Sequence, residues 1–178
     1  MKGSVKKGHE FELLVKKIID EVIARSKAEF RVEVLRHPRL EGFSTEWDPD
    51  LVLMATSLLF PSERSLELAV FECKYIGEAA SEGTYWSQMS RGYMSLNDLR
   101  LGYRENLQFY LVVNRYNKSK KRDYPEIFRN IGVKMVNIND PKGRAEFKKD
   151  VQQLLEETTF KKQAEKLRRI ARAYDKNL

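Results

Sequence analysis

The sequence is short of cysteine and of long apolar runs. Cys73 is the single cysteine in 178 residues, and no apolar run approaches the roughly 20 residues that cross a bilayer. One thiol excludes a disulfide framework and a zinc or iron–sulfur site built on several cysteines. The first residues carry lysines but no apolar stretch with a small-residue cleavage site. We therefore expect a cytoplasmic protein with no membrane partner.

Several catalytic signatures are also missing from the sequence. It has no glycine-rich phosphate loop, no nucleophile elbow and no Cys–His pair. Phosphoryl transfer from a nucleoside triphosphate therefore has no support. The two histidines, His9 and His37, are far apart in the sequence and lack metal-ligand spacing. His9 lies close to Glu12 along a helix and could bear on a site there, but we expect it to be a surface histidine.

Positive charge is present and unevenly distributed. The net charge is +7, of which residues 161–178 contribute +5 through seven basic and two acidic residues. Smaller basic clusters occur at residues 2–7 and 117–122. Localised positive charge suits a polyanion such as DNA, but a solvated helix that aids solubility explains the charge equally well.

The hydrophobic pattern predicts an α/β fold in a single domain over residues 1–178. Apolar residues recur with helical spacing over residues 9–25, and alternation or buried apolar runs predict strands elsewhere. The expected order is helix 9–25, strands 29–37, 51–60 and 66–77, helix 85–103, strand 106–116, helix 123–132, strand 133–139 and a basic C-terminal helix at about 143–175. Residues 39–49 are expected to be a loop. This order predicts a mixed sheet of about five strands flanked by helices.

The strand "LELAVFECKYIG" places charge where apolar side chains are expected. Alternation puts Leu66, Leu68 and Val70 on one face together with Glu72 and Lys74. In a hairpin with its turn at residues 61–64, paired residue numbers sum to about 125. Asp50 then lies opposite Tyr75, within two positions, and close to Glu72 and Lys74.

Two carboxylates that converge at the edge of an apolar sheet repel each other unless a cation lies between them. Oxygen ligands suit Mg²⁺ or Mn²⁺, and a bound ion lowers the pKa of its water and neutralises charge on a phosphoryl oxygen. Lys74 could orient that water or stabilise the transition state, and could act as a base only if its pKa were lowered. The alternative is a plain cross-strand ion pair between Glu72 and Lys74.

"DPDLVL" followed, after a hairpin, by "VFECKY" resembles the signature of the PD-(D/E)XK nuclease superfamily. "GHEFELL" is similar to the helix opening common among archaeal Holliday junction resolvases and some restriction-endonuclease-like families. The resemblance implies a restriction-endonuclease-like fold in which Glu12, Asp50 and Glu72 hold Mg²⁺ or Mn²⁺. Cys73 would contribute only its main-chain carbonyl, and Lys74 would assist catalysis. Asp48 replaces Asp50 as ligand if the strand begins earlier, and Glu12 fits equally well as a first-turn glutamate favoured by the helix dipole.

The helix after this motif and one basic loop supply further candidates. Gln88 and Tyr93 resemble a glutamine–tyrosine pair found in exonuclease branches of the superfamily, with one extra residue between them. The candidate DNA contacts are Gln88, Arg91, Lys118, Lys120, Lys121 and Arg122, with Ser87 as a further possibility. The alternative is a packed helix that turns Trp86, Met89, Tyr93 and Leu96 inward.

We therefore expect a metal-dependent DNA endonuclease, either structure-specific or restriction-type. Cutting both strands of a duplex requires two sites, which makes a homodimer the expected assembly. The alternative is a non-catalytic DNA-binding or accessory protein that keeps the nuclease fold.

Overall fold

The computed structural model describes residues 2–26, 30–42, 44–57, 66–78, 80–102, 107–116 and 123–157. Within these ranges the elements are α1 (Lys2–Arg25), β1 (Phe30–Arg36), β2 (Leu40–Glu41), β3 (Glu46–Trp47), β4 (Leu51–Ser57), β5 (Leu66–Lys74), α2 (Glu82–Gly102), β6 (Gln108–Val113), α3 (Tyr124–Asn130), β7 (Val133–Asn137) and α4 (Pro141–Glu157). None of the described helices is both long enough and apolar enough to span a membrane.

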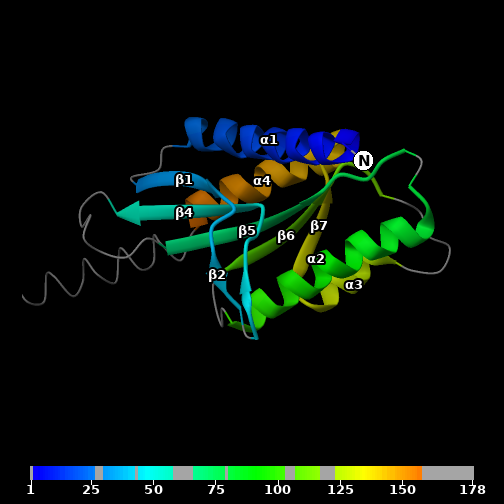
Figure 1. The fold of residues 1–178 in the computed structure, drawn as a ribbon. Helices are drawn as coiled ribbons and strands as arrows, with labels where there is room; N and C mark the ends of the chain where they lie inside the picture. The colour runs from blue at the N-terminus through cyan, green and yellow to red at the C-terminus, as the bar shows by residue number, and fades with distance from the viewer. Residues whose placement is uncertain are drawn as a thin grey trace, which may run out of the picture.

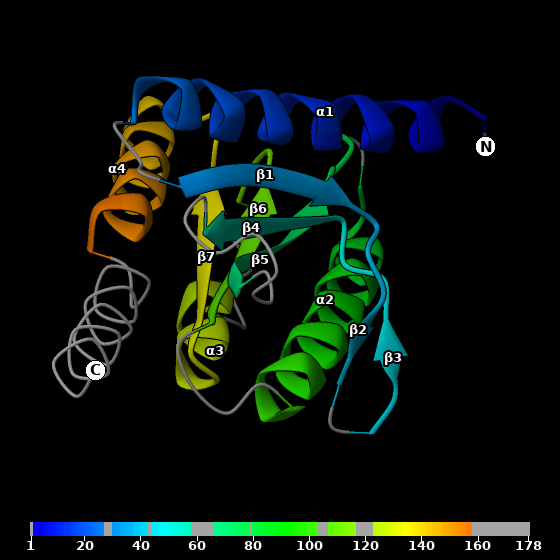
Figure 2. The same cartoon turned by 90° about the vertical axis from the view of Figure 1, so that its left-hand side faces the viewer.

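The protein is α/β, with a mixed five-stranded sheet in the order β1-β4-β5-β6-β7. The β1-β4-β5 part is antiparallel, and β5-β6-β7 is parallel. Helices α1 and α4 cover one face of the sheet, and α2 and α3 cover the other (Figures 1 and 2). The α/β class, the sheet and the order of its elements are thus as the sequence predicts.

Each face of the sheet has its own apolar core. Most of the predicted stripe of α1 is buried against the first face, although Leu14 of that stripe is exposed. The face of α4 formed by Phe147, Val151 and Leu155 is buried in the same core. On the second face, α2 contributes Met89 and Leu96. Helical spacing places these side chains in one stripe per helix, so each helix can bury one side while the other stays in water. The central strands are covered on both faces and are correspondingly apolar.

Element boundaries differ from expectation mainly at helix starts. Helix α1 begins at Lys2 rather than near residue 9, and α2 begins at Glu82 rather than near residue 85. Ser81 caps α2, since its Oγ accepts a hydrogen bond from Thr84 N at 3.2 Å. The predicted C-terminal helix is present as α4 up to Glu157, and its basic continuation lies outside the described residues.

Strand β5 contains a bulge that the alternation of the sequence does not predict. Leu53 pairs with Ala69 and Met54 with Glu67, so Leu68 is the extra residue. Leu68 and Ala69 both join the core beneath α1 and α4, whereas Val70 faces α2. The expectation that Leu68 shares a face with Val70 is therefore wrong, and the side chain of Leu66 lies outside the described part of the chain.

The β4–β5 hairpin forms as predicted, but its register differs. On the sheet side of the bulge, Leu51 pairs with Phe71 and Val52 with Val70, so paired numbers sum to 122 rather than about 125. Continuing this register places Asp50 opposite Glu72, three positions from Tyr75. The predicted turn at residues 61–64 lies outside the described residues. The difference brings Asp50 closer to Glu72 than the sequence suggests.

Residues 39–49 are not a simple loop, because they contain the short β2–β3 pair. Asp98 of α2 fixes the connection between these strands. Its carboxylate accepts hydrogen bonds from Ser44 N at 3.0 Å, Ser44 Oγ at 2.6 Å, Thr45 N at 3.3 Å and Trp47 Nε1 at 2.7 Å. The pKa of Asp98 is lowered, chiefly by the hydrogen bond from the Ser44 side chain, because these donors favour the carboxylate.

We expect Asp98→Asn to lower the melting temperature at neutral pH, because the amide cannot replace all four acceptor contacts. A lowered folded-state pKa gives stability that is present above the unfolded value, 3.8, and is lost as the pH falls through the folded value. The melting temperatures of wild type and variant should therefore converge in acid when followed by circular dichroism. Asp20→Asn, which removes an exposed carboxylate of α1 paired with Lys16, is the matched control. A constant difference at every pH would contradict this account.

Candidate active site

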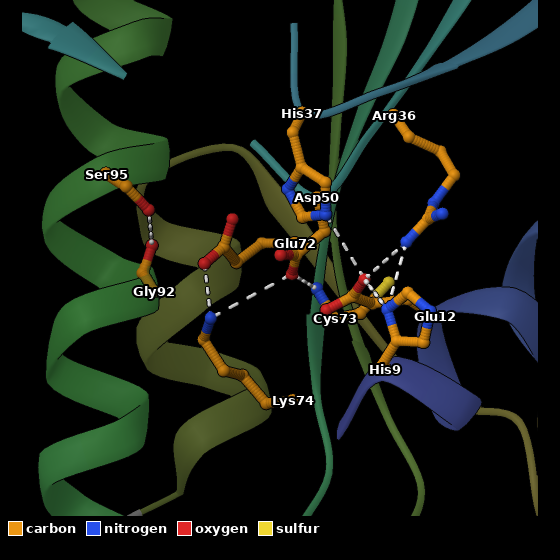
Figure 3. Close-up of polar contacts among 10 residues, drawn as sticks. All are labelled: His9, Glu12, Arg36, His37, Asp50, Glu72, Cys73, Lys74, Gly92 and Ser95. Atoms are coloured by element: carbon orange, nitrogen blue, oxygen red, sulfur yellow. Dashed lines mark hydrogen bonds and ion pairs between the residues drawn. The ribbon is translucent and has the colours of Figure 1, made fainter. Parts of the chain in front are cut away.

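Asp50, Glu72 and Lys74 meet where β4 begins and β5 ends. The backbone of Asp50 is fixed by β1, since the His37 N–H donates to the Asp50 carbonyl at 3.2 Å. Its side chain crosses to β5, where Oδ2 accepts the Cys73 N–H at 2.6 Å. Glu72 and Lys74 follow Val70 on the face that packs against α2. The three side chains therefore lie on the same side of the sheet (Figure 3).

The ammonium of Lys74 lies between the two carboxylates. Its Nζ is hydrogen-bonded to Glu72 Oε1 and lies 4.0 Å from Asp50 Oδ2. The side chains are only 21% exposed for Lys74, 12% for Glu72 and 15% for Asp50. Because little water reaches them, these charges interact more strongly than they would at an open surface.

Burial and mutual repulsion shift the protonation of this group. Burial, followed by the negative charge of Glu72, raises the pKa of Asp50 to about 7. Burial alone would lower the pKa of Lys74, but the charges of Glu72 and Asp50 outweigh it and raise that pKa. Lys74 is therefore an ammonium at neutral pH, suited to charge stabilisation rather than to proton abstraction.

Cys73, between Glu72 and Lys74, points to the opposite face of the sheet. Its side chain is buried in the core beneath α1 and α4, as alternation along the strand predicts. Burial raises the pKa of the thiol well above its usual value, so Cys73 is a neutral core residue. Only its backbone belongs to the site.

A glycine lets α2 pack closely over the acidic group. A Cβ at Gly92 would lie 3.1 Å from Leu111 Cδ1 and 3.8 Å from both Glu72 Cγ and Lys74 Cε. Helix α2 thereby covers the aliphatic parts of both charged side chains. A larger residue would displace either Leu111 or the helix.

The chain beyond Lys74 is held by Asn114, which follows β6. Its Oδ1 accepts the Ile76 N–H at 2.6 Å and its Nδ2 donates to the Ile76 carbonyl at 3.0 Å. These two bonds replace the ladder contacts that β5 has lost at this point. Arg115 also donates to the Gly77 carbonyl. The end of the strand that carries Lys74 is thus held in place.

Glu12 belongs to a second, adjacent polar group. Its Oε2 lies 3.3 Å from Arg36 Nη2, 3.3 Å from His37 Nε2 and 3.8 Å from His9 Nδ1. Figure 3 shows this group beside the Asp50–Glu72–Lys74 group. Glu12 is near enough to Asp50 for its charge to contribute to the raised pKa of that carboxyl. The structure does not bring the three acids into one cluster, and no set of three His, Cys, Asp or Glu side chains in the described ranges is arranged to hold a metal ion.

Members of both groups line one cleft of about 680 Å³, Glu72 and Lys74 from the first and His9, Glu12 and His37 from the second. Gln88 and Arg91 of α2 line it too, as the sequence suggests for DNA contacts. The Oε1 atom of Gln88 is buried and has no hydrogen-bond partner among the described residues, so it is free to accept one from a bound molecule. Arg91 is exposed.

Asp48 lines the cleft as well, but it is 60% exposed and lies 4.0 Å from Arg39, whereas Asp50 contacts Lys74. The remaining predicted residues lie elsewhere. Tyr93 packs edge-on against Phe128, away from the cleft. Ser87 is exposed, and the basic candidates Lys118, Lys120, Lys121 and Arg122 lie outside the described residues. Met89 and Leu96 pack inward as the alternative for α2 predicts, but Trp86 is 41% exposed.

Sequence reasoning missed Arg36 and the convergence of the two histidines on Glu12. His9 is exposed at the surface, as expected, and so is His37, yet both side chains also approach the Glu12 carboxylate. Arg36 pairs with Leu51 across β1 and β4, so it ends one strand where the neighbouring strand begins, next to Asp50. Pairing the predicted strands 29–37 and 51–60 was the signal that could have found it.

Comparison with protein-family models finds no match, and comparison with curated proteins finds none either. A solved structure, that of the protein of unknown function AF1548, is similar at 15% sequence identity and a TM-score of 0.45. The similarity covers 74% of this chain and 58% of that one. A resemblance this weak assigns neither a fold family nor an activity.

We expect Asp50→Asn to stabilise the metal-free protein at pH 8. A folded-state pKa of about 7 against an unfolded value of 3.8 means that ionising Asp50 costs stability progressively as the pH rises from 3.8 to about 7. The amide avoids this cost, on the order of 4 kcal/mol. Urea unfolding in EDTA should therefore show a gain at pH 8 that largely disappears near pH 4. A loss of stability at pH 8 would contradict the repulsion described here.

Proposed function

We propose that the protein is a metal-dependent endonuclease that hydrolyses phosphodiester bonds in DNA. One observation carries the proposal: Glu72 and Lys74 line a single cleft, and the carboxylate of Asp50, from the adjacent strand end, lies 4.0 Å from the Lys74 ammonium. A plain ion pair would need only Glu72 and Lys74. Asp50 adds a second, largely buried carboxylate, whose ionised form is destabilised by burial and by the charge of Glu72. The proposal includes a restriction-endonuclease-like arrangement of the sheet and a cytoplasmic location.

The residues present fit a hard divalent cation. Two carboxylates in poor contact with water have one ammonium between them, and burial, followed by the negative charge of Glu72, raises the pKa of Asp50. Asp50, Glu72 and the Cys73 carbonyl would hold Mg²⁺ or Mn²⁺, and Glu12 would join them. When bound, the ion would activate a water and neutralise charge on the phosphate.

Lys74 would stabilise the negative charge on the phosphoryl oxygens as the attacking oxygen bonds to phosphorus. An ammonium with a raised pKa keeps its proton and acts by attraction, because it is positive before, during and after attack. Gly92 and α2 limit the water around it, so the attraction is less screened. Gln88 and Arg91 would position the DNA backbone along the cleft, and a homodimer would bring two clefts to one duplex.

A non-catalytic DNA-binding role is the second candidate. One observation favours it: Glu12 pairs with Arg36 and His37 instead of facing Asp50 and Glu72. In such a protein, Lys74 would serve only to neutralise buried carboxylates. Cleavage and binding assays separate the two functions.

We expect the wild type to cut plasmid and four-way-junction DNA with Mg²⁺ and not with EDTA. Lys74→Ala should slow cutting about a hundredfold or more, because charge stabilisation in a partly dehydrated site is lost. Single-turnover cleavage with gel readout measures the rate, and binding should persist. Lys142→Ala, at an exposed position of α4, is the matched control and should cut normally. Metal-independent binding with no cutting by the wild type would favour the accessory role.

Mn²⁺ should raise the melting temperature of the wild type at pH 8 and do so less at pH 6. Because Asp50 has a pKa near 7, a proton competes with the ion at the lower pH. Glu72→Gln should abolish most of this shift. Differential scanning fluorimetry with Mn²⁺ against EDTA measures it, with Glu10→Gln, an exposed glutamate of α1, as control. An equal shift in wild type and Glu72→Gln would place the ion elsewhere.

A further inference from the structure

The two histidines of the chain and Arg36 converge on one carboxylate oxygen. His9 comes from α1, Arg36 ends β1 and His37 follows it, yet all three lie within 3.8 Å of Glu12 Oε2. His9, Glu12 and His37 line the same cleft as Lys74. Figure 3 shows the group as a neighbour of the acidic pair rather than part of it.

Two hydrogen bonds of Arg36 and one ion-pair contact of His37 define two cationic groups that face Glu12 and one residue that orients Arg36. Arg36 Nη2 lies 3.2 Å from His9 Nδ1, and a guanidinium can only donate, so His9 Nδ1 accepts. That nitrogen carries no proton to offer Glu12. His9 therefore orients Arg36, while Arg36 and His37 hold the Glu12 oxygen. Two donors directed at one oxygen make a small oxyanion-binding site.

Two features bear on whether this site can bind another anion: the strained backbone of His37 and an unused hydrogen-bond donor on Arg36. His37 has φ of 48°, in the left-handed region that non-glycine residues seldom adopt. Its N–H is bonded to the Asp50 carbonyl, which holds the strained residue in place. Arg36 Nε is buried and has no hydrogen-bond partner within the described residues. A single carboxylate oxygen thus leaves part of the guanidinium fork unused.

We propose that Arg36 and His37, oriented by His9, form a subsite for a DNA backbone phosphate, and that Glu12 occupies this subsite in the free protein. A phosphodiester presents two non-bridging oxygens, which match a guanidinium fork better than the single oxygen that Glu12 supplies. A bound phosphate displaces Glu12 and leaves its carboxylate free to face Asp50 and Glu72. The inference rests on the proposed function, since it takes DNA as the ligand of the cleft.

The displacement gives a defined coupling between Glu12 and Arg36. If Glu12 competes with DNA for Arg36, removing its charge strengthens DNA binding only while Arg36 is present. A general change in net charge would act in both backgrounds alike. A double-mutant cycle of Glu12→Gln and Arg36→Gln, measured without metal, therefore separates competition from simple charge.

The experiment measures binding of a fluorescein-labelled DNA duplex by anisotropy in EDTA. We expect Arg36→Gln to weaken binding roughly tenfold and to lower the slope of log affinity against log salt by about one. In the background with Arg36 intact, Glu12→Gln should tighten DNA binding severalfold. In the Arg36→Gln background, it should tighten binding no more than the control Glu10→Gln does. Arg39→Gln, which removes an exposed arginine three positions away, controls for loss of positive charge.

If Arg36→Gln does not fold, His37→Asn replaces it in the same cycle, because asparagine tolerates the positive φ of position 37. Circular dichroism checks that each variant is folded. An equal gain from Glu12→Gln with and without Arg36 would overturn the subsite, as would equal losses in Arg36→Gln and Arg39→Gln. If the wild type cuts DNA while either result holds, the proposed function stands without the subsite. If the wild type neither binds nor cuts DNA, both proposals are wrong.

Discussion

The contact between the Lys74 ammonium and two carboxylates is the interaction on which the cleft depends. Without that positive charge, Asp50 and Glu72 would face each other across adjacent strands with little water to separate them. Lys74 lets both acids stay at the edge of an apolar sheet, and Gly92 lets α2 pack over the aliphatic parts of Glu72 and Lys74. The arrangement remains electrostatically incomplete, as the raised pKa of Asp50 shows. That incompleteness is what a divalent ion would relieve.

The order of elements could be predicted because helix and strand periodicities differ strongly in this chain. The stripe of α1 and the apolar run of β4 leave little ambiguity. The register of β4 and β5 could not be predicted as well, because it depends on the bulge at Leu68 and on the length of the connection. The β2–β3 pair depends on Asp98, some fifty residues away, and no local pattern indicates that contact.

The same distinction applies to the candidate site. Asp50, Glu72 and Lys74 were found from the sequence because a hairpin brings nearby segments together, so an error of three positions did little harm. Arg36 and His37 were missed because their approach to Glu12 depends on the packing of α1 over β1 as well as on strand pairing. A charged residue at the end of a strand indicates a functional site only once its neighbours in space are known. The sequence thus indicated the acidic pair and gave no sign of the oxyanion site beside it.

The bulge in β5 also bears on how relatives of this chain can be recognised. Leu68 interrupts the alternation between the two faces, since the consecutive residues Leu68 and Ala69 face one core and Val70 faces the other. A homologue without the extra residue would show the same Glu-x-Lys end preceded by a differently phased apolar pattern. Alignments of distant relatives should therefore be anchored on residues 69–74 and allow a one-residue gap at position 68.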